Sequence, residues 1–341
     1  MRYGVLFGGR SFEHEISIVS AIALKEQELI EGVFLFLDQE HEWYLIEPKA
    51  LRADLFIKGE YKKMPKVRLE KSGFYLKGLL GSKRVEMDRV LNLIHGGDGE
   101  DGHIAALLDF YEIPYIGPRV EASVVGFNKL LTKLYAKEMG CAVLPYQLLR
   151  RGEPVELEFA YPVILKPVRL GSSIGLAVAK NKEELEYGLD VAFEFDDEVL
   201  IEPFIEGIDE YNLAGCKSED FCFSRIEKVQ KGSLLDFEQK YMDFAREEVA
   251  GADLPTDLQA KMKDSFAKVY DPLFLGSLVR MDFFVHEDEV YLNEINAVPG
   301  SLAHYLFDDF QSVLRRLATN LPKSRRIPIE YRYISSISAK K

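Results

Sequence analysis

The sequence predicts an α/β protein of several domains, and three observations support this prediction. The 341 residues are too many for one ordinary hydrophobic core. The first third of the chain alternates short apolar strands with helical patterns, which is typical of a parallel sheet flanked by helices. Two later stretches mix helices with hairpins, as α+β domains do. We therefore expect domains over residues 1–127, 128–208 and 209–341.

Composition narrows the class of protein. Hydrophobic residues make up 47% and charged residues 29%, the balance of a soluble globular protein. The net charge of -13 argues against coating of nucleic acid, which needs clustered Lys and Arg. The N-terminus lacks a signal-peptide core and no apolar run approaches ~18 residues, so we expect a cytoplasmic protein without a membrane partner. The scattered Cys141, Cys216 and Cys222 are expected to be reduced thiols.

The N-terminal domain opens with an apolar strand over 3–7, a Gly-Gly turn and a helix. A second strand over 90–94 leads into the loop HGGDGEDG and another helix, and IPYIG reads as a third strand. Ligands bind where strands of parallel sheets end, so Glu13 and His95 are candidate ligand contacts. Helix capping by Glu13 and a loop hydrogen bond from His95 are the alternatives. Residues 39–89 are polar and strand-rich, and read as an elaboration of this domain.

The central domain begins with a helix near Asn128 that stops at Gly140. Next, the strand YPVILKPV runs into LGSSIG, a glycine-rich loop whose N–H groups can cradle phosphate beside Lys166. A plain hairpin turn is the alternative. Further candidates for phosphate contacts are the loop serines Ser172 and Ser173, and Lys129 at the helix start. For Lys129, a solvated lysine on the helix surface is the alternative.

The segment EVLIEPFIEGIDEY combines an apolar strand with carboxylates. Adenine needs an apolar slot, a backbone edge and an acceptor for its amino group, and ribose needs a carboxylate. Glu202, Phe204, Ile205 and Glu210 can supply these groups. Solvated acidic residues at strand ends are the alternative.

The hairpin LVRMDFFVHEDEVYLNEINAVPGS places polar residues inside two apolar strands. Arg280 and Asp282 share one strand face because alternate residues point the same way, and so do Glu294 and Asn296. Both pairs face one side only if Asp282 opposes Glu294, which requires an odd-numbered loop such as 287–289 or a bulge. The clustered oxygens suit Mg²⁺, a hard cation. A salt bridge of Arg280 on an exposed face is the alternative.

The order of these candidates along the chain resembles that of the ATP-grasp ligases, and more closely that of the D-alanine–D-alanine ligase family. The resemblance spans about residues 1–320 and is carried by GGRSFEHEIS, HGGDGEDG, YIGP with FNK, LKPVRLGSSIG, QKYMDF and RMDFF…NEINAVPG. It implies a three-domain ATP-grasp architecture in which the last two domains clamp ATP. It further implies ligation of two D-alanines through an acyl phosphate for peptidoglycan synthesis, by a homodimer.

The resemblance also implies roles for individual residues. ATP would be bound by Lys129, Lys166, Ser172, Ser173, Glu202, Phe204, Ile205, Glu210 and Lys240. Two Mg²⁺ (or Mn²⁺) would be held by Asp282, Glu294 and Asn296. The D-alanines would meet Glu13, His95, Lys240, Arg280, Tyr305 and Leu306. Catalysis would fall to Glu13, Ser172, Tyr241, Arg280 and Gly300, with Arg280 and the Gly300 N–H at the oxyanion rather than at the carboxylates.

In the family, Tyr at the position of Tyr241 accompanies dipeptide rather than depsipeptide formation, so this residue bears on substrate specificity. The resemblance also implies that residues 233–250 form a lid over the site. The chain departs from the family pattern at Tyr305, where Ser is common, at Phe204, where Trp is frequent, and at Leu170, where a charged residue is common. The first departure leaves affinity for the second substrate open. An ATP-grasp ligase with another acceptor, and a nucleotide-sensing module without activity, are the rival hypotheses.

Overall fold

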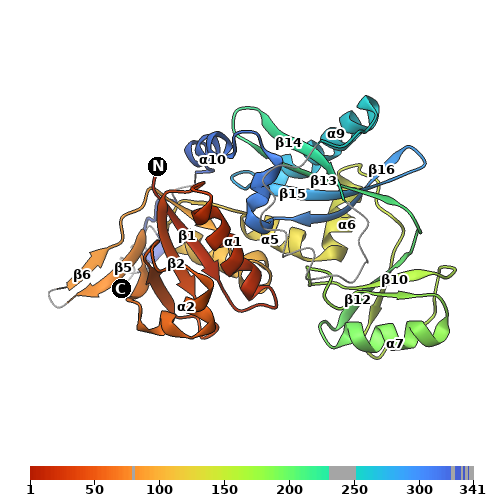
Figure 1. The fold of residues 1–341 in the computed structure, drawn as a ribbon, viewed down its shortest axis with the longest axis horizontal. Coiled ribbons are helices and arrows are strands. Elements are labelled where there is room, and N and C mark those ends of the chain that lie inside the picture. The colour runs from red at the N-terminus through yellow and green to blue at the C-terminus, as the bar shows by residue number, and fades with distance from the viewer. Residues whose placement is uncertain (79–80, 230–250, 324–326, 332, 335–336, 338–341) are drawn as a thin grey trace.

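Three β-sheets follow one another along the chain in the computed structural model (Figure 1). The structure describes residues 1–78, 81–229, 251–323, 327–331, 333–334 and 337. The sheets contain eight, four and four strands, and each has helices packed against it. The boundaries at 127/128 and 208/209 stay a prediction.

The N-terminal sheet has the order β6-β5-β4-β3-β2-β1-β7-β8. The predicted parallel sheet is confirmed for one half, where β2 (Gly32–Leu37), β1 (Tyr3–Gly8), β7 (Arg89–Asn92) and β8 (Tyr115–Ile116) pair in parallel. Residues 39–89, which the sequence indicated as an elaboration of this domain, form an antiparallel extension of the sheet. It contains β3 (Trp43–Ile46), β4 (Lys66–Glu70), β5 (Gly73–Gly78) and β6 (Gly81–Arg84).

Helical segments of the N-terminal region connect and cover these strands. The two that matter most for the site are α1 (His14–Glu26), which begins directly after the first glycine turn, and α3 (Gly97–Glu100), in the second glycine-rich loop. The others are α2 (Ala53–Ile57), η1 (Glu60–Lys63), α4 (His103–Phe110) and α5 (Val120–Phe127).

The central region is an antiparallel sheet with the order β11-β10-β12-β9. Its strands are β9 (Gln147–Arg150), β10 (Val163–Pro167), β11 (Ala177–Ala179) and β12 (Glu198–Pro203). The helix α7 (Lys182–Phe193) covers one face, and the fully buried side chains between them form a small separate core. The helix α6 (Lys129–Glu138) begins at Asn128, whose side chain accepts a hydrogen bond from the Leu131 N–H.

The C-terminal sheet has the order β14-β13-β15-β16, all antiparallel. The long helix α9 (Thr256–Leu273) packs on it through Met262, Phe266 and Tyr270, which are fully buried. The strands are β13 (Asp209–Lys217), β14 (Phe221–Lys228), β15 (Val279–His286) and β16 (Glu289–Asn296). The short helix η2 (Gly300–Leu306) and then α10 (Phe310–Thr319) follow.

The β15–β16 hairpin tests the predicted register. Asp282 opposes Glu294 and Arg280 opposes Asn296, as expected. The odd-numbered loop is wrong, because a two-residue turn at Glu287-Asp288, both with positive φ, joins the strands. A bulge between Asp282 and Phe283 supplies the required shift instead, and it leaves Asn293 as the extra residue of β16.

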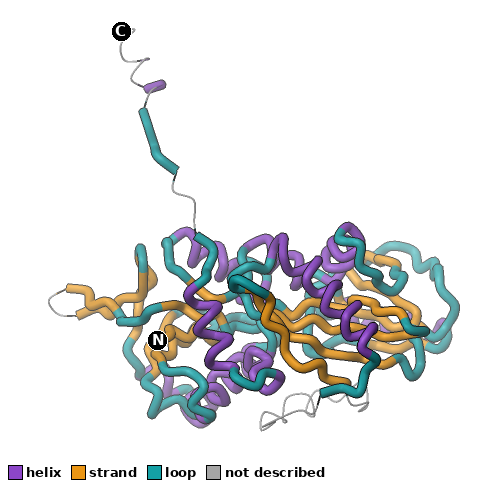
Figure 2. The backbone as a smooth tube through the Cα atoms, turned by 90° about the horizontal axis from the view of Figure 1, so that it is seen from above, coloured by secondary structure: helices purple, strands orange, loops and turns teal. Residues whose placement is uncertain are grey.

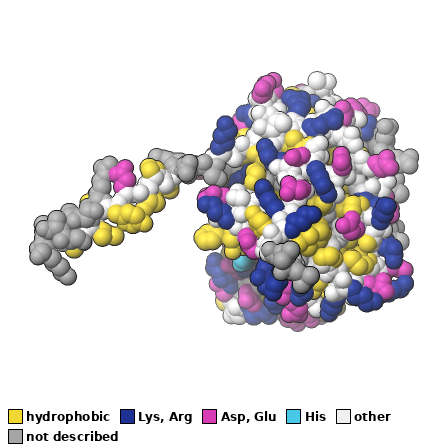
Figure 3. Space-filling view, turned by 90° about the vertical axis from the view of Figure 1, so that its left-hand side faces the viewer, with side chains coloured by type: hydrophobic (Ala, Val, Ile, Leu, Met, Phe, Trp, Pro, Cys, Tyr) yellow, Lys and Arg dark blue, Asp and Glu magenta, His cyan; other side chains and the backbone are white. Residues whose placement is uncertain are grey.

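No helix in the described ranges is both long and apolar enough to cross a membrane. The described residues 327–331 lie away from the body (Figure 2), and Ile327, Ile329 and Tyr331 are exposed. Lys and Arg are interspersed with Asp and Glu on the face of the body seen beside this segment (Figure 3). All three cysteines are free thiols, as predicted.

Candidate active site

A row of four polar side chains crosses the C-terminal sheet. Glu227 on β14 opposes Asn212 on β13, Asn212 opposes Asp282 on β15, and Asp282 opposes Glu294 on β16. Residues directly opposite one another share a sheet face, so all four lie on one side. The row is held together at one end by a 3.0 Å hydrogen bond from Asn212 Nδ2 to Glu227 Oε2. Sequence reasoning found only the β15 and β16 members of this row.

Arg280 pairs with the carboxylate that was predicted to bind metal. Its Nε and Nη2 donate to the two oxygens of Asp282 at 2.7 and 2.9 Å, and Asn296 Nδ2 donates to Asp282 Oδ2 at 3.0 Å. Burial opposes the charge of Arg280, but the facing Asp282 carboxylate outweighs burial and holds the pKa of the guanidinium well above its ordinary value. Arg280 is thus the salt-bridge partner of Asp282 in this structure, whereas its expected role at the reacting carbonyl stays a prediction.

The bulge in β16 points two consecutive residues at the same side of the sheet. Leu292 and Ile295 on either side of it are buried in the core. Asn293 Oδ1 accepts a 3.1 Å hydrogen bond from Lys166 Nζ, and Glu294 Oε2 lies 3.5 Å from Lys129 Nζ. The bulge thereby brings both predicted phosphate-binding lysines against the C-terminal hairpin.

Glu202 lies fully buried between two lysines. Its oxygens lie 2.9 Å from Lys166 Nζ and 2.8 Å from Lys133 Nζ. Burial opposes the charge of Glu202, but Lys166 and then Lys133 hold the pKa of this carboxyl below its ordinary value. Burial lowers the pKa of Lys133. Lys133 was not among the site residues predicted from the sequence. In the absence of a nucleotide, Glu202 thus neutralises the charge of Lys166.

The other predicted nucleotide contacts lie near this group. Phe204 and Ile205, just after β12, are partly exposed, and the Phe204 N–H bonds to the Pro162 carbonyl at 2.9 Å. Glu210 opposes Phe284 in the sheet, and Lys166 Nζ lies 5.8 Å from the centre of the Phe284 ring. Phe284 is a further apolar candidate for the nucleotide slot, signalled only by its place two residues after Asp282.

The glycine-rich loop of the central region folds against the N-terminal region. Ser172 Oγ donates a hydrogen bond to Glu13 Oε1, and Lys129 Nζ donates to the Leu170 carbonyl at 2.6 Å. Ser172 and Ser173 both adopt positive φ, at 58° and 59°. Non-glycine residues rarely hold this conformation, which costs about 1–2 kcal/mol each and persists where the surroundings impose it.

Glu13 is enclosed by backbone and by a second carboxyl group. A Cβ on Gly96, where φ is +63°, would lie 2.6 Å from Glu13 Oε2, so only glycine fits there. Burial raises the pKa of Glu13, and the Ser172 hydrogen bond lowers it in part. Glu100, which accepts from the Gly96 N–H at 2.9 Å, has its pKa raised to about 8 by burial and then by Glu13. Sequence reasoning did not single out Glu100.

His95 is taken up by the protein rather than by a ligand. Its Nδ1 lies 2.9 Å from the Val298 carbonyl and its Nε2 lies 3.0 Å from Ser20 Oγ. Burial lowers the pKa of His95 to about 4, so the ring is neutral near pH 7. Both ring nitrogens of His95 thus have protein partners in this structure, and its predicted contact with D-alanine stays a prediction.

The segment after β16 makes a left-handed turn. Ser301, Leu302 and Ala303 have φ of 46°, 54° and 49°. Gly300, just before them, borders open space, because a Cβ built on it would meet no atom within 4 Å. Two residues were predicted to contact the second D-alanine. Tyr305 lies close enough to Arg280 to contribute to the raised pKa of the guanidinium. The Leu306 side chain is buried in the core.

The site fits a hard divalent cation. Asp282, Glu294 and Asn296 supply oxygen atoms from one sheet face, and Asn212 Oδ1 in the same row is buried without a hydrogen-bond partner among the described residues. An oxygen-only donor set with an unpaired acceptor beside it is the chemistry that Mg²⁺ prefers.

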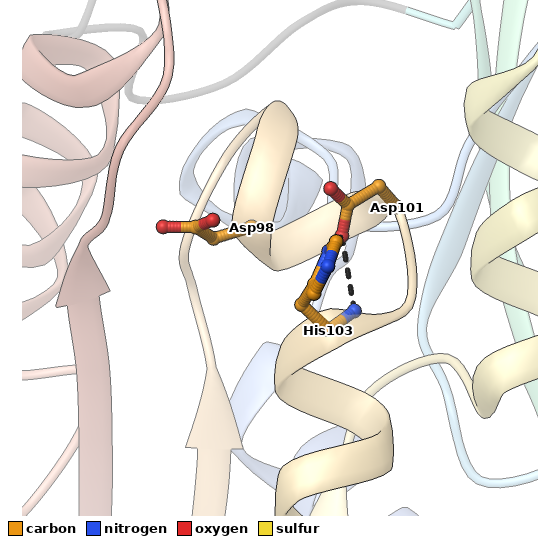
Figure 4. A group of neighbouring side chains, drawn as sticks. All are labelled: Asp98, Asp101 and His103. Atoms are coloured by element: carbon orange, nitrogen blue, oxygen red, sulfur yellow. Dashed lines mark hydrogen bonds and ion pairs between the residues drawn. The ribbon is translucent and has the colours of Figure 1, made fainter. Parts of the chain in front are cut away.

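A second acidic cluster, Asp98, Asp101 and His103 (Figure 4), lies in the second glycine-rich loop. Its two carboxylates accept hydrogen bonds from backbone N–H groups: Asp98 from Arg10 at 2.8 Å and Asp101 from His103 at 3.0 Å. Local hydrogen bonding accounts for this cluster. Lys240 and Tyr241 lie outside the described residues.

Comparison with known proteins gives matches over nearly the whole chain. Residues 2–118 match the family described as D-ala D-ala ligase N-terminus, and residues 135–312 match D-ala D-ala ligase C-terminus. D-alanine–D-alanine ligases from Nitratiruptor and Wolinella succinogenes are 60% and 56% identical, and each alignment covers 100% of this chain and 99–100% of the relative. The crystal structure of the Helicobacter pylori D-alanine-D-alanine ligase is 50% identical and superposes with a TM-score of 0.85 over 95% of this chain and 100% of that chain.

Proposed function

Because the chain belongs to the D-alanine–D-alanine ligase family, we propose that it joins two molecules of D-alanine to D-alanyl-D-alanine, with release of ADP and phosphate, for peptidoglycan precursor synthesis. The observation that supports this most is the meeting of three elements: the oxygen row of the C-terminal sheet, the two lysines that face it, and the Glu13–Ser172 pair.

We propose that ATP lies between the central and C-terminal sheets, with the domains divided at 127/128 and 208/209. Lys129 stands at the N-terminus of α6, where backbone N–H groups and a cation favour phosphate. Lys166 and the loop with Ser172 and Ser173 would meet further phosphate oxygens. Phe204 and Ile205 would flank the adenine, while Glu202 would accept from its amino group. Glu210 would bind the ribose.

Asp282, Glu294 and Asn296 would hold two Mg²⁺ or Mn²⁺. Bound there, the ions neutralise the charge that builds up on the transferred phosphoryl group. With a cation held by Asp282, the pairing of Asp282 with Arg280 would be weaker, and the guanidinium would be available to the reacting carbonyl.

The reaction needs two steps and a closed site. The carboxylate of the first D-alanine attacks the γ-phosphorus, and ADP leaves with the electrons of the broken P–O bond. The amine of the second D-alanine then attacks the acyl phosphate carbonyl, and the tetrahedral intermediate collapses by expelling phosphate. Glu13 would hold the ammonium group of the first D-alanine, and Arg280 with the Gly300 N–H would stabilise the oxyanion.

Substrate choice falls to residues at the second subsite. Tyr241, which lies outside the described residues, predicts dipeptide over depsipeptide formation, and Lys240 would contact both ATP and the second D-alanine. Tyr305 would approach the carboxylate of that D-alanine. We also expect a cytoplasmic homodimer, on family resemblance.

Release of phosphate in the presence of ATP, Mg²⁺ and either D-alanine or L-alanine tests the proposed function. D-alanine should stimulate release strongly, with D-alanyl-D-alanine appearing in equal amount by mass spectrometry, and L-alanine should not. Folded protein that releases no phosphate with D-alanine would overturn the proposal.

A further inference from the structure

Two hydrogen bonds from the N-terminal region bracket Gly300. On one side of it, His95 Nδ1 contacts the Val298 carbonyl at 2.9 Å. On the other side, the Ser301 N–H donates to Ser20 Oγ at 3.0 Å. The two contacts join in one network, because Ser20 Oγ also lies 3.0 Å from His95 Nε2. Ser20 is fully buried on α1, and it belongs to none of the motifs that the sequence singled out.

The direction of every hydrogen bond in this network is determined. The Val298 carbonyl can only accept, so His95 Nδ1 carries the proton and the neutral ring presents a lone pair at Nε2. Ser20 therefore donates its hydroxyl proton to Nε2, and its oxygen is left to accept from the Ser301 N–H. The Ser20 hydroxyl is the partner of both His95 Nε2 and the Ser301 N–H, so its removal leaves these two buried polar groups unpaired.

The segment that the network holds has an unusual backbone conformation. Three successive non-glycine residues, Ser301 to Ala303, have left-handed backbone angles, and such runs persist only where surrounding contacts impose them. The Ser20 contact is made to the first residue of this run. Gly300, whose backbone borders open space, lies between the two fixed points.

We infer that Ser20 is a positioning residue for the ligation step: acting through His95 and the Ser301 N–H, it fixes the direction of the Gly300 N–H at the oxyanion. The inference rests on the proposed function, which assigns that N–H to the tetrahedral intermediate. Displacement of a preorganised donor by about 1 Å reduces the rate by about 10–100-fold, and reduces binding of ground states far less.

The chain provides a matched control one helical turn away. Ser17 is also fully buried on α1, and its hydroxyl likewise accepts a backbone N–H, from Gly8 at 2.9 Å, and donates to a backbone carbonyl, of Leu93 at 2.6 Å. The Ser17 bonds end in the N-terminal sheet rather than at the Gly300 segment. Ser20→Ala and Ser17→Ala thus each remove a fully buried hydroxyl that accepts one hydrogen bond and donates another.

The test measures kcat, the KM for ATP and the inhibition constant of a phosphinate dipeptide, whose tetrahedral phosphorus mimics the intermediate. Ser20→Ala should lower kcat about 10–100-fold, weaken phosphinate binding by a similar factor and leave the KM for ATP unchanged. Ser20→Cys, which keeps the shape but bonds weakly, should behave in the same way. Ser17→Ala should shift the melting temperature comparably without the selective loss of phosphinate affinity.

Equal phosphinate affinity in Ser20→Ala and Ser17→Ala would overturn the inference while leaving the proposed function intact. Absence of D-alanine-dependent phosphate release from the wild-type chain would instead contradict the proposed function itself. If Ser20→Ala does not fold, the comparison between Ser20→Cys and Ser17→Ala decides the question.

Discussion

At the residue scale, buried charges at the proposed nucleotide site are paired with opposite charges. Glu202 sits between Lys133 and Lys166, and both cations are almost fully buried with it. A buried carboxylate with two cations is tolerable, but removing one partner leaves an uncompensated charge. The sequence did not predict Lys133, because a lysine one turn after Lys129 on an amphipathic helix is usually solvated. The spacing of Lys133 four residues after Lys129, which places both lysines on one face of α6, is the sequence feature that indicates its role.

Replacement of Lys133 by methionine should lower the free energy of unfolding by about 3–5 kcal/mol, because Glu202 loses its nearest buried partner. Lys137→Met is the control, since Lys137 lies one turn further along α6 and is exposed. Denaturant unfolding of both variants without ATP measures the difference. A loss no greater than that of Lys137→Met would show that Lys133 is not a required counter-charge.

Glu100 makes the free energy of unfolding depend on pH. Its pKa is raised to about 8, so between pH 4.5 and 8 the unfolded chain loses this proton while the folded chain keeps it, and stability falls as pH rises. Glu100→Gln removes this pH dependence, because glutamine does not titrate. The stability advantage of this variant over wild type should therefore grow by about 2–4 kcal/mol between pH 5 and pH 8.

Denaturant unfolding at pH 5, 6.5 and 8 measures this effect. The exposed Glu121→Gln serves as the control and should give a difference from wild type that does not change with pH. A constant difference for Glu100→Gln as well would contradict the buried, uncharged state of Glu100.

At the scale of elements, the β16 bulge aligns the site. The sequence alternation required Asp282 to oppose Glu294, and this pairing was predictable because a slip of one residue would turn the apolar residues outward. The position of the bulge was not predictable, since a turn of Glu287-Asp288 carries no Asn-Gly signal. The contact of Asn293 with Lys166 follows from the bulge and was missed with it.

Two variants of Asn293 separate its amide from the bulge. Asn293→Ala keeps the bulge and loses the Lys166 contact, so the KM for ATP should rise roughly 3–10-fold, the value of one hydrogen bond. Deletion of Asn293 removes the bulge as well, but keeps Asp282 opposite Glu294. Its KM for ATP should rise to a similar extent, and its Mg²⁺ dependence should match that of Asn293→Ala. Loss of Mg²⁺ dependence in the deletion alone would contradict the register.

At the scale of the whole molecule, the site forms where three sheets meet. The N-terminal region reaches the central region through Glu13 and Ser172, and through the Phe12 and Phe195 rings, whose centres lie 5.4 Å apart. It reaches the C-terminal region through the backbone bond from Gly117 to Gly276 at 3.0 Å. Motif order supplied the residues that are proposed for the site. It could not predict which partners they find there, because docking depends on surfaces distant in sequence.

Arg280 illustrates this limit. The chain order placed it beside the predicted metal ligands, and the family resemblance assigned it to the oxyanion, but the structure pairs it with Asp282. The pairing and the assignment are compatible only if a cation takes over the Asp282 oxygens. The proposed roles of Arg280 and Asp282 therefore both depend on a metal site on the polar row of the C-terminal sheet.

Titration of Mn²⁺ in the presence of a non-hydrolysable ATP analogue, followed by electron paramagnetic resonance, tests this claim most directly. The wild-type chain should bind two ions, and Glu294→Gln should bind at least one of them about tenfold more weakly or worse, because a charged ligand is lost. Glu289→Gln, at the exposed end of the same strand, should bind as wild type does. Identical Mn²⁺ binding by wild type and Glu294→Gln would contradict the account.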